Sequence, residues 1–457
     1  MSSGKDLLLA KIRSGEELSF GQQVKLSGLL SYPAIIAQFS SVVMQYIDAS
    51  MVGHLSAAAG ASIALVSTCL WLLGGFCFAL CNGFSVQVAH LIGANDFKEA
   101  RNVVRQALVT ALLWGGTFAL LGCAVAKPLP TWLGGNPEIV GNAYKYFLIN
   151  CLFLPFMQLD FMSATLLQCS GNMKVPSMLN IMMCVLDVVF NYIFIYVLDF
   201  GVTGAALGTG FAEVVTALSM TGYLAFRSRE LSFVHERGIF IPTRRTLGKA
   251  MRIGLPMCLE NLVMRGAHIA GTVIVAPLGT LAIAANGFAI TAESFCYMPG
   301  YGIADAGTAL VGQSLGAGRK KLAKSLAWIT TSGAMLIMSV TAVLMALFAP
   351  QLMAMLSPDP DVIALGARML RIEALAETMY AASIVAFGCF VGAGDTMIPS
   401  CMNFGSMWLF RIVPAAFLCP VMGLKGYWIA MCVELNIRGA IFLFRLARGR
   451  WMRAFKA

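Results

Sequence analysis

Long uncharged stretches dominate this sequence and restrict what it can fold into. Apolar runs recur along its 457 residues, and each is long enough to cross a hydrocarbon core of about 30 Å. Only 12% of the residues are charged, whereas soluble domains carry about 25%. The sequence therefore predicts an all-α membrane protein rather than a large soluble core.

Twelve membrane helices are predicted, six in each half of the chain. Those of the first half cover residues 28–53, 61–92, 103–126, 140–168, 176–198 and 202–226. Those of the second half cover residues 251–276, 282–314, 323–349, 365–391, 399–421 and 424–447. We expect an N-lobe of helices 1–6 (residues 1–226), a cytoplasmic linker (227–249) and a C-lobe of helices 7–12 (250–457).

The two halves are an internal repeat. A shift of 223 residues places Pro33 on Pro256 and Gly171 on Gly394, and it also aligns the loops Ile92–Asn95 and Leu315–Gly318. Because six helices return the chain to its starting side, the repeats are expected to be parallel, with the substrate between them. Nothing resembles a selectivity-filter loop, so alternating access is favoured over a duplicated channel.

The basic residues set the orientation. If the N-terminus is cytoplasmic, 25 of the 32 Lys and Arg residues lie in cytoplasmic segments. Both termini are therefore expected in the cytoplasm, with the chain multi-pass in the inner membrane. This distribution also explains the net charge of +10 without nucleic acid as a partner. Residues Met1–Ser27 have no apolar core with a cleavage site, so no signal peptide is expected.

Enzymatic chemistry has little support in the sequence. The thirteen cysteines are scattered without a C-x-x-C pair, and the four histidines form no H-E-x-x-H motif. No P-loop is present, so ATP is not expected to drive the protein directly. We predict a protein that is not an enzyme, with no cofactor and no structural metal.

Four segments carry a family resemblance. They are Ile47–Leu55 (I-D-A-S-M-V-G-H-L), Gly204–Thr209 (G-A-A-L-G-T), Val311–Gly318 (V-G-Q-S-L-G-A-G) and Gly394–Thr396 before Pro399. Together they resemble the multidrug and toxic compound extrusion (MATE) family over nearly the whole chain. The resemblance implies a secondary active antiporter that exports organic cations, drugs or toxic compounds in exchange for Na⁺ or H⁺.

Two alternatives accompany this interpretation. A lipid-linked oligosaccharide flippase of the same superfamily is the other function considered, and the Val311–Gly318 motif argues against it. Within the family, the DinF-like branch is favoured over the NorM-like branch, because an acid on helix 1 and polar residues on helix 5 match the N-lobe cation site of that branch. The expected partners are a small cationic or amphipathic substrate and membrane lipids, and the protein is expected to be a monomer.

The N-lobe holds the main candidate site. Asp48 ends a stripe with Gln38, Ser41 and Gln45, whose spacing places all four residues on one face of helix 1. Charged groups at membrane depth are costly and mark functional sites, and the resemblance makes Asp48 the coupling carboxylate. Helix 5 carries a similar stripe: Asn180, Cys184, Asp187 and Asn191.

Helix 5 departs from the family pattern. The family usually has Asn and Asp four residues apart, whereas here Asp187 precedes Asn191. The exchange should keep one carboxylate and one amide on the same cavity wall. Carboxylate, amide and hydroxyl oxygens suit a hard cation, so Na⁺ at Asp48, Asp187 and Asn191 or a bound proton is expected.

Further ion-coupling candidates are carried over from the resemblance or lie close to those residues. Tyr146 on helix 4 and Thr209 on helix 6 are expected to line the cavity. The asparagine usual on helix 4 falls on Ala164, and Asp160 one turn earlier is a candidate replacement. Glu213, one turn beyond Thr209, and Gln45 are secondary candidates.

The C-lobe offers a weaker pair of candidates. Glu260 follows Pro256 by four residues on helix 7, and Glu377 lies on helix 10. The NorM-like branch uses an acid on each of these helices, about one turn from these positions. Both residues are secondary candidates for binding the ion or a cationic substrate.

Overall fold

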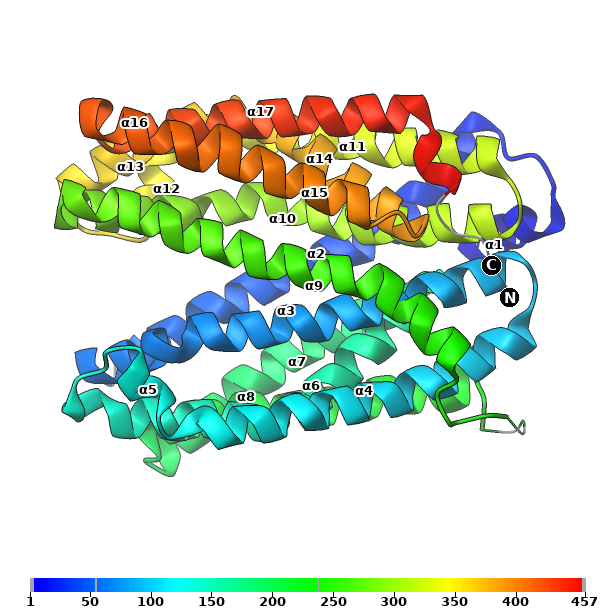
Figure 1. Ribbon diagram of the computed structural model, residues 1–457, viewed down its shortest axis with the longest axis horizontal. Coiled ribbons are helices and arrows are strands. Elements are labelled where there is room, and N and C mark those ends of the chain that lie inside the picture. Colours follow the sequence, from blue (N-terminus) through cyan, green and yellow to red (C-terminus); the bar gives the residue numbers. More distant parts are fainter. Residues whose placement is uncertain (1–3, 54–55, 235, 237, 454–457) are drawn as a thin grey trace. The chain divides into compact units, whose positions relative to one another are not determined.

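The computed structural model describes residues 4–53, 56–234, 236 and 238–453, and almost all of them are helical (Figure 1). His54 and Leu55, which end the first signature segment, lie outside the described residues. The elements before the linker are α1 Gly4–Ser14, α2 Phe20–Gly53, α3 Ala57–Gly93, α4 Phe97–Ala126, α5 Leu129–Trp132, α6 Pro137–Cys169, α7 Lys174–Tyr192, η1 Ile193–Val197, α8 Gly201–Gly222 and η2 Tyr223–Arg227. Those after it are α9 Arg244–Val275, η3 Ala276–Leu278, α10 Thr280–Gly316, α11 Lys320–Leu347, α12 Ala349–Ala354, α13 Pro360–Glu373, α14 Glu377–Gly392, α15 Met397–Ser406, η4 Met407–Ile412, α16 Val413–Met422, α17 Leu424–Arg448 and η5 Arg450–Arg453.

The long helices match the predicted membrane segments. Within the described residues, ten are long and apolar enough to cross a membrane, and α13 with α14 makes an eleventh if that bent pair is one span. The remaining helix, α17, lies at the predicted place of helix 12. The all-α membrane fold predicted from the apolar runs is therefore confirmed.

One predicted helix is broken in the structure. Residues 365–391 were expected to form a single helix, but α13 ends at Glu373, α14 begins at Glu377, and the two are bent by 60°. Between them the backbone closes tighter turns, because Leu375 N–H bonds to Ile372 O and Ala376 N–H to Glu373 O. No proline or glycine lies in Ile372–Glu377 to signal this break.

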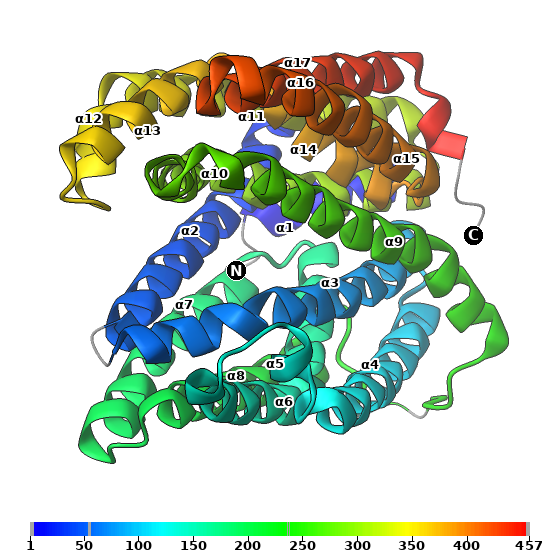
Figure 2. The ribbon, with the colours of Figure 1, turned by 60° about the vertical axis from the view of Figure 1, so that its left-hand side comes forward.

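The chain forms two compact units. Unit 2 is residues 39–258, and unit 1 combines residues 1–38 with residues 259–457. Within unit 2, α6 is central and packs along α3, α4 and α8 (Figures 1 and 2). Within unit 1, α14 packs in the same way against α10, α11 and α17. These helices correspond pairwise at the offset of 223, so the sequence repeat is also a repeat of packing.

Each unit includes the start of a helix that ends in the other unit. The division falls inside α2, five residues after Pro33, and inside α9, two residues after Pro256. In unit 1, Gly302 of α10 lies so close to α2 that an added Cβ would be 2.7 Å from the backbone nitrogen of Ile35. In unit 2, an added Cβ on Gly83 of α3 would lie 2.3 Å from the backbone oxygen of Ala250 in α9. Glycine at these positions lets the backbones approach, as in other membrane helix interfaces.

The repeated loop motifs have a backbone explanation. Asn95 and Gly318 are equivalent positions, with φ of 60° and 73°, and Gly171 and Gly394 are also equivalent, with φ of 86° and 74°. Glycine and asparagine tolerate this left-handed conformation better than other residues. The same helix-ending turns are thus kept in both halves.

Within unit 2, the predicted linker packs against α4 through a buried arginine. Arg105 of α4 is 1% exposed and donates hydrogen bonds to the backbone oxygens of Phe233 and Glu236. Its guanidinium also lies over the rings of Phe233 and Phe240. In unit 1, Arg319 donates to the backbone oxygen of Lys11 near the C-terminal end of α1.

Candidate functional site

Three of the predicted polar residues meet inside unit 2. The side-chain amide of Asn191 on α7 donates to Asp48 Oδ1 on α2 at 3.0 Å and to Asp187 Oδ2 at 3.2 Å. Asp187 is 0% and Asn191 2% exposed, whereas Asp48 is half-buried. Asn191 therefore joins the two carboxylates across the interface between α2 and α7.

The geometry of α7 explains this arrangement. Asp187 and Asn191 are four residues apart, which places them one above the other on the same helix face. Directly after Tyr192 the helix continues as the π-helical turn η1. Single π-helical turns within α-helices occur frequently at functional sites.

Helix α8 forms a third wall of the site. A Cβ added to Gly208 would lie 2.1 Å from Asn191 Oδ1 and 2.8 Å from the Asn191 backbone nitrogen. The absence of a side chain at this glycine thus brings α8 against α7 at the level of the site. Thr209, the next residue, interacts with the side chain of Asp187.

Tyr146 of α6 is also part of this region. Its ring packs against the cluster that contains Val52, Ile195 and Val202. Both Asp48 and Asp187 lie close enough to act electrostatically on its hydroxyl. The structure therefore brings Tyr146 and Thr209 to the same two carboxylates.

The remaining N-lobe candidates lie around this centre. Asn180 donates to Ser41 Oγ at 2.9 Å, which is a second polar contact between α7 and α2. Gln45 lies on α2 between Ser41 and Asp48 and is exposed. Asp160 on α6 and Glu213 on α8 are both buried at 7% exposure.

Two oxygen atoms at the centre of the site are buried and have no hydrogen-bond partner among the described residues. They are Asp187 Oδ1 and Asn191 Oδ1. A buried polar atom without a partner costs about 1–3 kcal/mol, so such atoms mark a place where a ligand is favoured. Together with the Asp48 carboxylate and the Thr209 hydroxyl, they supply oxygen ligands suited to a hard cation or a proton.

Unit 1 holds a different set of polar contacts. Glu260 on α9 accepts hydrogen bonds from Ser400 Oγ and Asn403 Nδ2 on α15. Glu377, the other C-lobe candidate, is 0% exposed at the start of α14. It interacts electrostatically with Glu293 rather than with the Glu260 group.

Sequence reasoning missed Glu373, which ends α13 on the other side of the helix break. Glu373 is 0% exposed, and both of its carboxylate oxygens are buried without a hydrogen-bond partner among the described residues. The charges of Glu293, Glu373 and Glu377 interact with one another. The spacing of four residues between Glu373 and Glu377 was the available signal, but a continuous helix does not predict their position at a bend.

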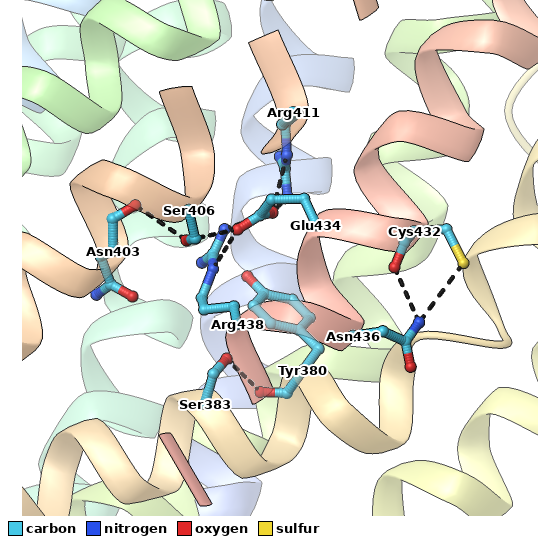
Figure 3. A network of polar contacts seen from close by, with 9 residues as sticks. All are labelled: Tyr380, Ser383, Asn403, Ser406, Arg411, Cys432, Glu434, Asn436 and Arg438. Carbon is cyan, nitrogen blue, oxygen red and sulfur yellow. Dashed lines mark hydrogen bonds and ion pairs between the residues drawn. The ribbon is translucent and has the colours of Figure 1, made fainter. Parts of the chain in front are cut away.

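Sequence reasoning also missed a buried charge network in unit 1 (Figure 3). Glu434 of α17 is 0% exposed and lies between two arginines, accepting from Arg411 Nη2 at 2.8 Å and from Arg438 Nη2 at 2.7 Å. Ser406 Oγ also donates to Glu434 at 2.8 Å. The Glu434–Arg438 spacing of four residues was visible in the sequence, whereas the contribution of Arg411 from the π-helical turn η4 was not.

Comparison with known proteins identifies the family. The MatE family model matches residues 33–193 and again residues 256–417, so it begins twice at the offset of the sequence repeat. The chain belongs to the MatE family. It is therefore a membrane transporter rather than an enzyme, and the resemblance drawn from its motifs is confirmed.

Individual relatives of this MatE transporter cover nearly its whole length. It is 24% identical over 432 residues to a probable multidrug resistance protein NorM of Thermotoga maritima, covering 92% of each chain. It is 25% identical over 438 residues to the multidrug resistance protein MdtK of Yersinia pestis strain Pestoides F, covering 93% of this chain and 94% of that protein. A multidrug resistance MATE transporter solved in an outward-facing conformation matches with a TM-score of 0.90 at 21% identity, over 98% of this chain and 99% of that one. That match shows the shared fold.

Proposed function

We propose that this MatE transporter exports organic cations, drugs or other toxic compounds in exchange for Na⁺ or H⁺ by alternating access. The observation that carries the proposal is the hydrogen bonding of the Asn191 amide to both Asp48 and Asp187, while a buried oxygen of Asp187 and one of Asn191 have no hydrogen-bond partner among the described residues. The relatives named as multidrug resistance proteins support the substrate class.

The coupling ion is proposed to bind at Asp48, Asp187, Asn191 and Thr209, with Tyr146 beside them. An ion drives such a transporter only if it binds one conformation more tightly than the other. Two carboxylates in an apolar interior meet this requirement, because their charge must be neutralised by a cation or a proton when the site is closed to water. This N-lobe location supports placement in the DinF-like branch.

The cellular setting is part of the proposal. We infer a monomer in the inner membrane with both termini in the cytoplasm, supported by the Lys and Arg bias of its loops. The substrate is a small cationic or amphipathic molecule. Its exchange for an inward-moving ion would use the gradient across that membrane.

Dye accumulation in everted membrane vesicles tests this function. A Na⁺ gradient and a pH gradient are imposed separately, and uptake of a cationic fluorescent dye is followed. We expect uptake with at least one of the two gradients and none in vesicles without the protein. Dye uptake that does not depend on either gradient would overturn the proposal. Gradient-independent flipping of a labelled lipid-linked sugar would favour a flippase.

A further inference from the structure

The linker between the two halves carries three consecutive apolar side chains on the surface of unit 2. These residues, Ile239, Phe240 and Ile241, are 53%, 51% and 78% exposed and are called the linker triplet below. They lie outside the helices, in the segment that leads into α9 at Arg244. Contiguous exposed apolar side chains mark interaction surfaces, so the triplet calls for a partner.

Helix α4 holds the linker triplet in place. Before the triplet, Gly238 lies so close to α4 that an added Cβ would be 1.8 Å from Arg105 Nη1. Within it, the ring centre of Phe240 lies 5.8 Å from the guanidinium carbon of Arg105. After it, the Thr243 N–H donates to Gln106 Oε1 at 3.0 Å. The segment is therefore fixed against unit 2 at both ends while its apolar side chains stay on the surface.

The contacts with α4 also set the depth of the linker. This helix is a candidate membrane span of 30 residues, which at about 1.5 Å per residue exceeds a hydrocarbon core of about 30 Å. Because Lys98, Glu99 and Arg101 lie in its first turns, those turns are expected in the lipid headgroup layer. Arg101 donates to the backbone oxygen of Glu230 in the linker at 3.1 Å. The linker thus runs along α4 at the level of the headgroups.

The surroundings of the linker triplet are basic. Residues 227–252 contain seven Lys and Arg but only two acids, and one of these, Glu236, is paired with Arg101. Arg244 and Arg245 begin α9 just beyond the triplet and are exposed. Neither forms an ion pair within the described part of the chain. Their charges are therefore available to an anionic partner.

We propose that the linker segment Gly238–Arg245 binds anionic phospholipid of the cytoplasmic leaflet. The triplet enters the boundary between headgroups and acyl chains, and Arg244 and Arg245 bind the lipid phosphates. Apolar and basic side chains together at this depth are the combination that an anionic membrane surface attracts. The inference takes only the side of the membrane from the proposed function, because lipid binding at this segment requires no transport.

Photo-crosslinking of the full-length protein in lipid nanodiscs tests this contact. Phosphatidylglycerol or phosphatidylcholine with a diazirine near the headgroup is added as a trace probe to the same mixed bilayer, and mass spectrometry quantifies lipid adducts on residues 238–249. One basic residue at an anionic surface contributes about 1 kcal/mol, or about fivefold in binding, so we expect phosphatidylglycerol to give at least about fivefold more adduct. The double variant Arg244→Gln with Arg245→Gln should remove most of this preference. The matched control is Lys320→Gln with Lys321→Gln, an exposed basic pair that begins α11, and it should leave the preference unchanged.

A second variant tests the apolar part of the surface. Ile241→Ser should lower the adduct yield from both lipids while keeping their ratio, because it removes an apolar contact and no charge. The proposal would be overturned by equal yields from the two lipids in the wild type, by an unchanged preference in the double arginine variant, or by crosslinks from this segment to a second copy of the chain in place of lipid. Such a result with gradient-driven dye uptake intact would leave the proposed function standing, whereas loss of all gradient dependence with the lipid preference present would remove the function and keep this surface.

Discussion

Asn180 and Asn403 occupy equivalent positions in the two repeats, and each donates a hydrogen bond to the first long helix of its own half, α2 or α9. Asn180 donates to Ser41 in unit 2, and Asn403 donates to Glu260 in unit 1. The contact between these helices is thus conserved within the molecule while the chemistry of the acceptor differs.

The acids themselves do not follow the repeat. The positions equivalent to Asp48 and Asp187 are Gly271 and Phe410, and a Cβ added to Gly271 would lie 2.4 Å from the hydroxyl of Tyr427. The two halves therefore share the same helix packing but carry different polar groups at equivalent positions. This difference lets mutations separate the roles of the two units.

The first prediction concerns an exchange of Asp187 and Asn191 on α7, which tests their role in the proposed ion site. Asp187→Asn removes one of the two carboxylates that Asn191 joins, so we expect gradient-driven efflux to fall to background. Adding Asn191→Asp returns a carboxylate one turn away on the same face and gives the order usual in the family. We expect the double variant to regain a large part of the efflux, measured as dye export from cells at matched expression.

The single variant Asn191→Asp tests whether the added carboxylate alone is sufficient or whether the amide is also needed. It places three carboxylates together and removes the amide donor that joins Asp48 to Asp187. This single variant should be inactive or respond only at lower pH. If the double variant were as inactive as both single variants, the site would depend on the particular residue at each position rather than on one carboxylate and one amide.

A second prediction tests the close packing of Gly208 on α8 against Asn191 on α7. Gly208→Ala places a methyl group against the backbone nitrogen and the side chain of Asn191, which α8 can accommodate only by moving away from α7. Overpacking of this kind costs about 1–3 kcal/mol, so we expect a lower melting temperature in detergent and reduced efflux. The control is Gly222→Ala on the same helix, where nothing lies within 4 Å of the added Cβ. Equal melting temperatures for the two variants would contradict the close approach.

Much of the framework could be predicted because it depends on local patterns. Apolar run lengths gave the helices, and the constant offset gave the repeat. The spacing of four residues placed Asp187 and Asn191 on one face. Contacts between helices are not encoded so locally, which is why the sequence did not reveal that Asn191 joins Asp48 to Asp187.

The missed features share one physical cause. The bend between Glu373 and Glu377 has no proline or glycine, so tertiary packing rather than local propensity determines it. Arg411 reaches Glu434 from a π-helical turn, and a regular helical spacing does not predict that direction. Likewise, the division of α2 and α9 between the two units depends on contacts formed far along the chain.

The charge network in unit 1 gives a third prediction. Glu434→Gln leaves Arg411 and Arg438 buried without their counter-charge, and breaking a buried ion pair in this way costs about 3–5 kcal/mol. We expect a large fall in the melting temperature of the detergent-solubilised protein. Adding Arg438→Met removes one of the two uncompensated cations and should recover part of the loss. A single variant as stable as wild type would show that the network contributes little to folding.

Asp48→Asn is the most direct test of coupling. Asparagine keeps the shape and much of the hydrogen-bonding capacity of aspartate, but it cannot take up a proton or neutralise a cation. The half-buried position of Asp48 and its contact with Asn191 predict a folded variant, checked by size-exclusion chromatography and thermal melting. Because an ion must bind one conformation better than the other to drive the cycle, we expect gradient-driven efflux to fall to background. Substrate binding in detergent should persist, since the variant loses the driving ion rather than the fold. Normal gradient-driven efflux by well-expressed Asp48→Asn would instead place coupling elsewhere, with Glu260 and Glu377 as the next carboxylates to replace.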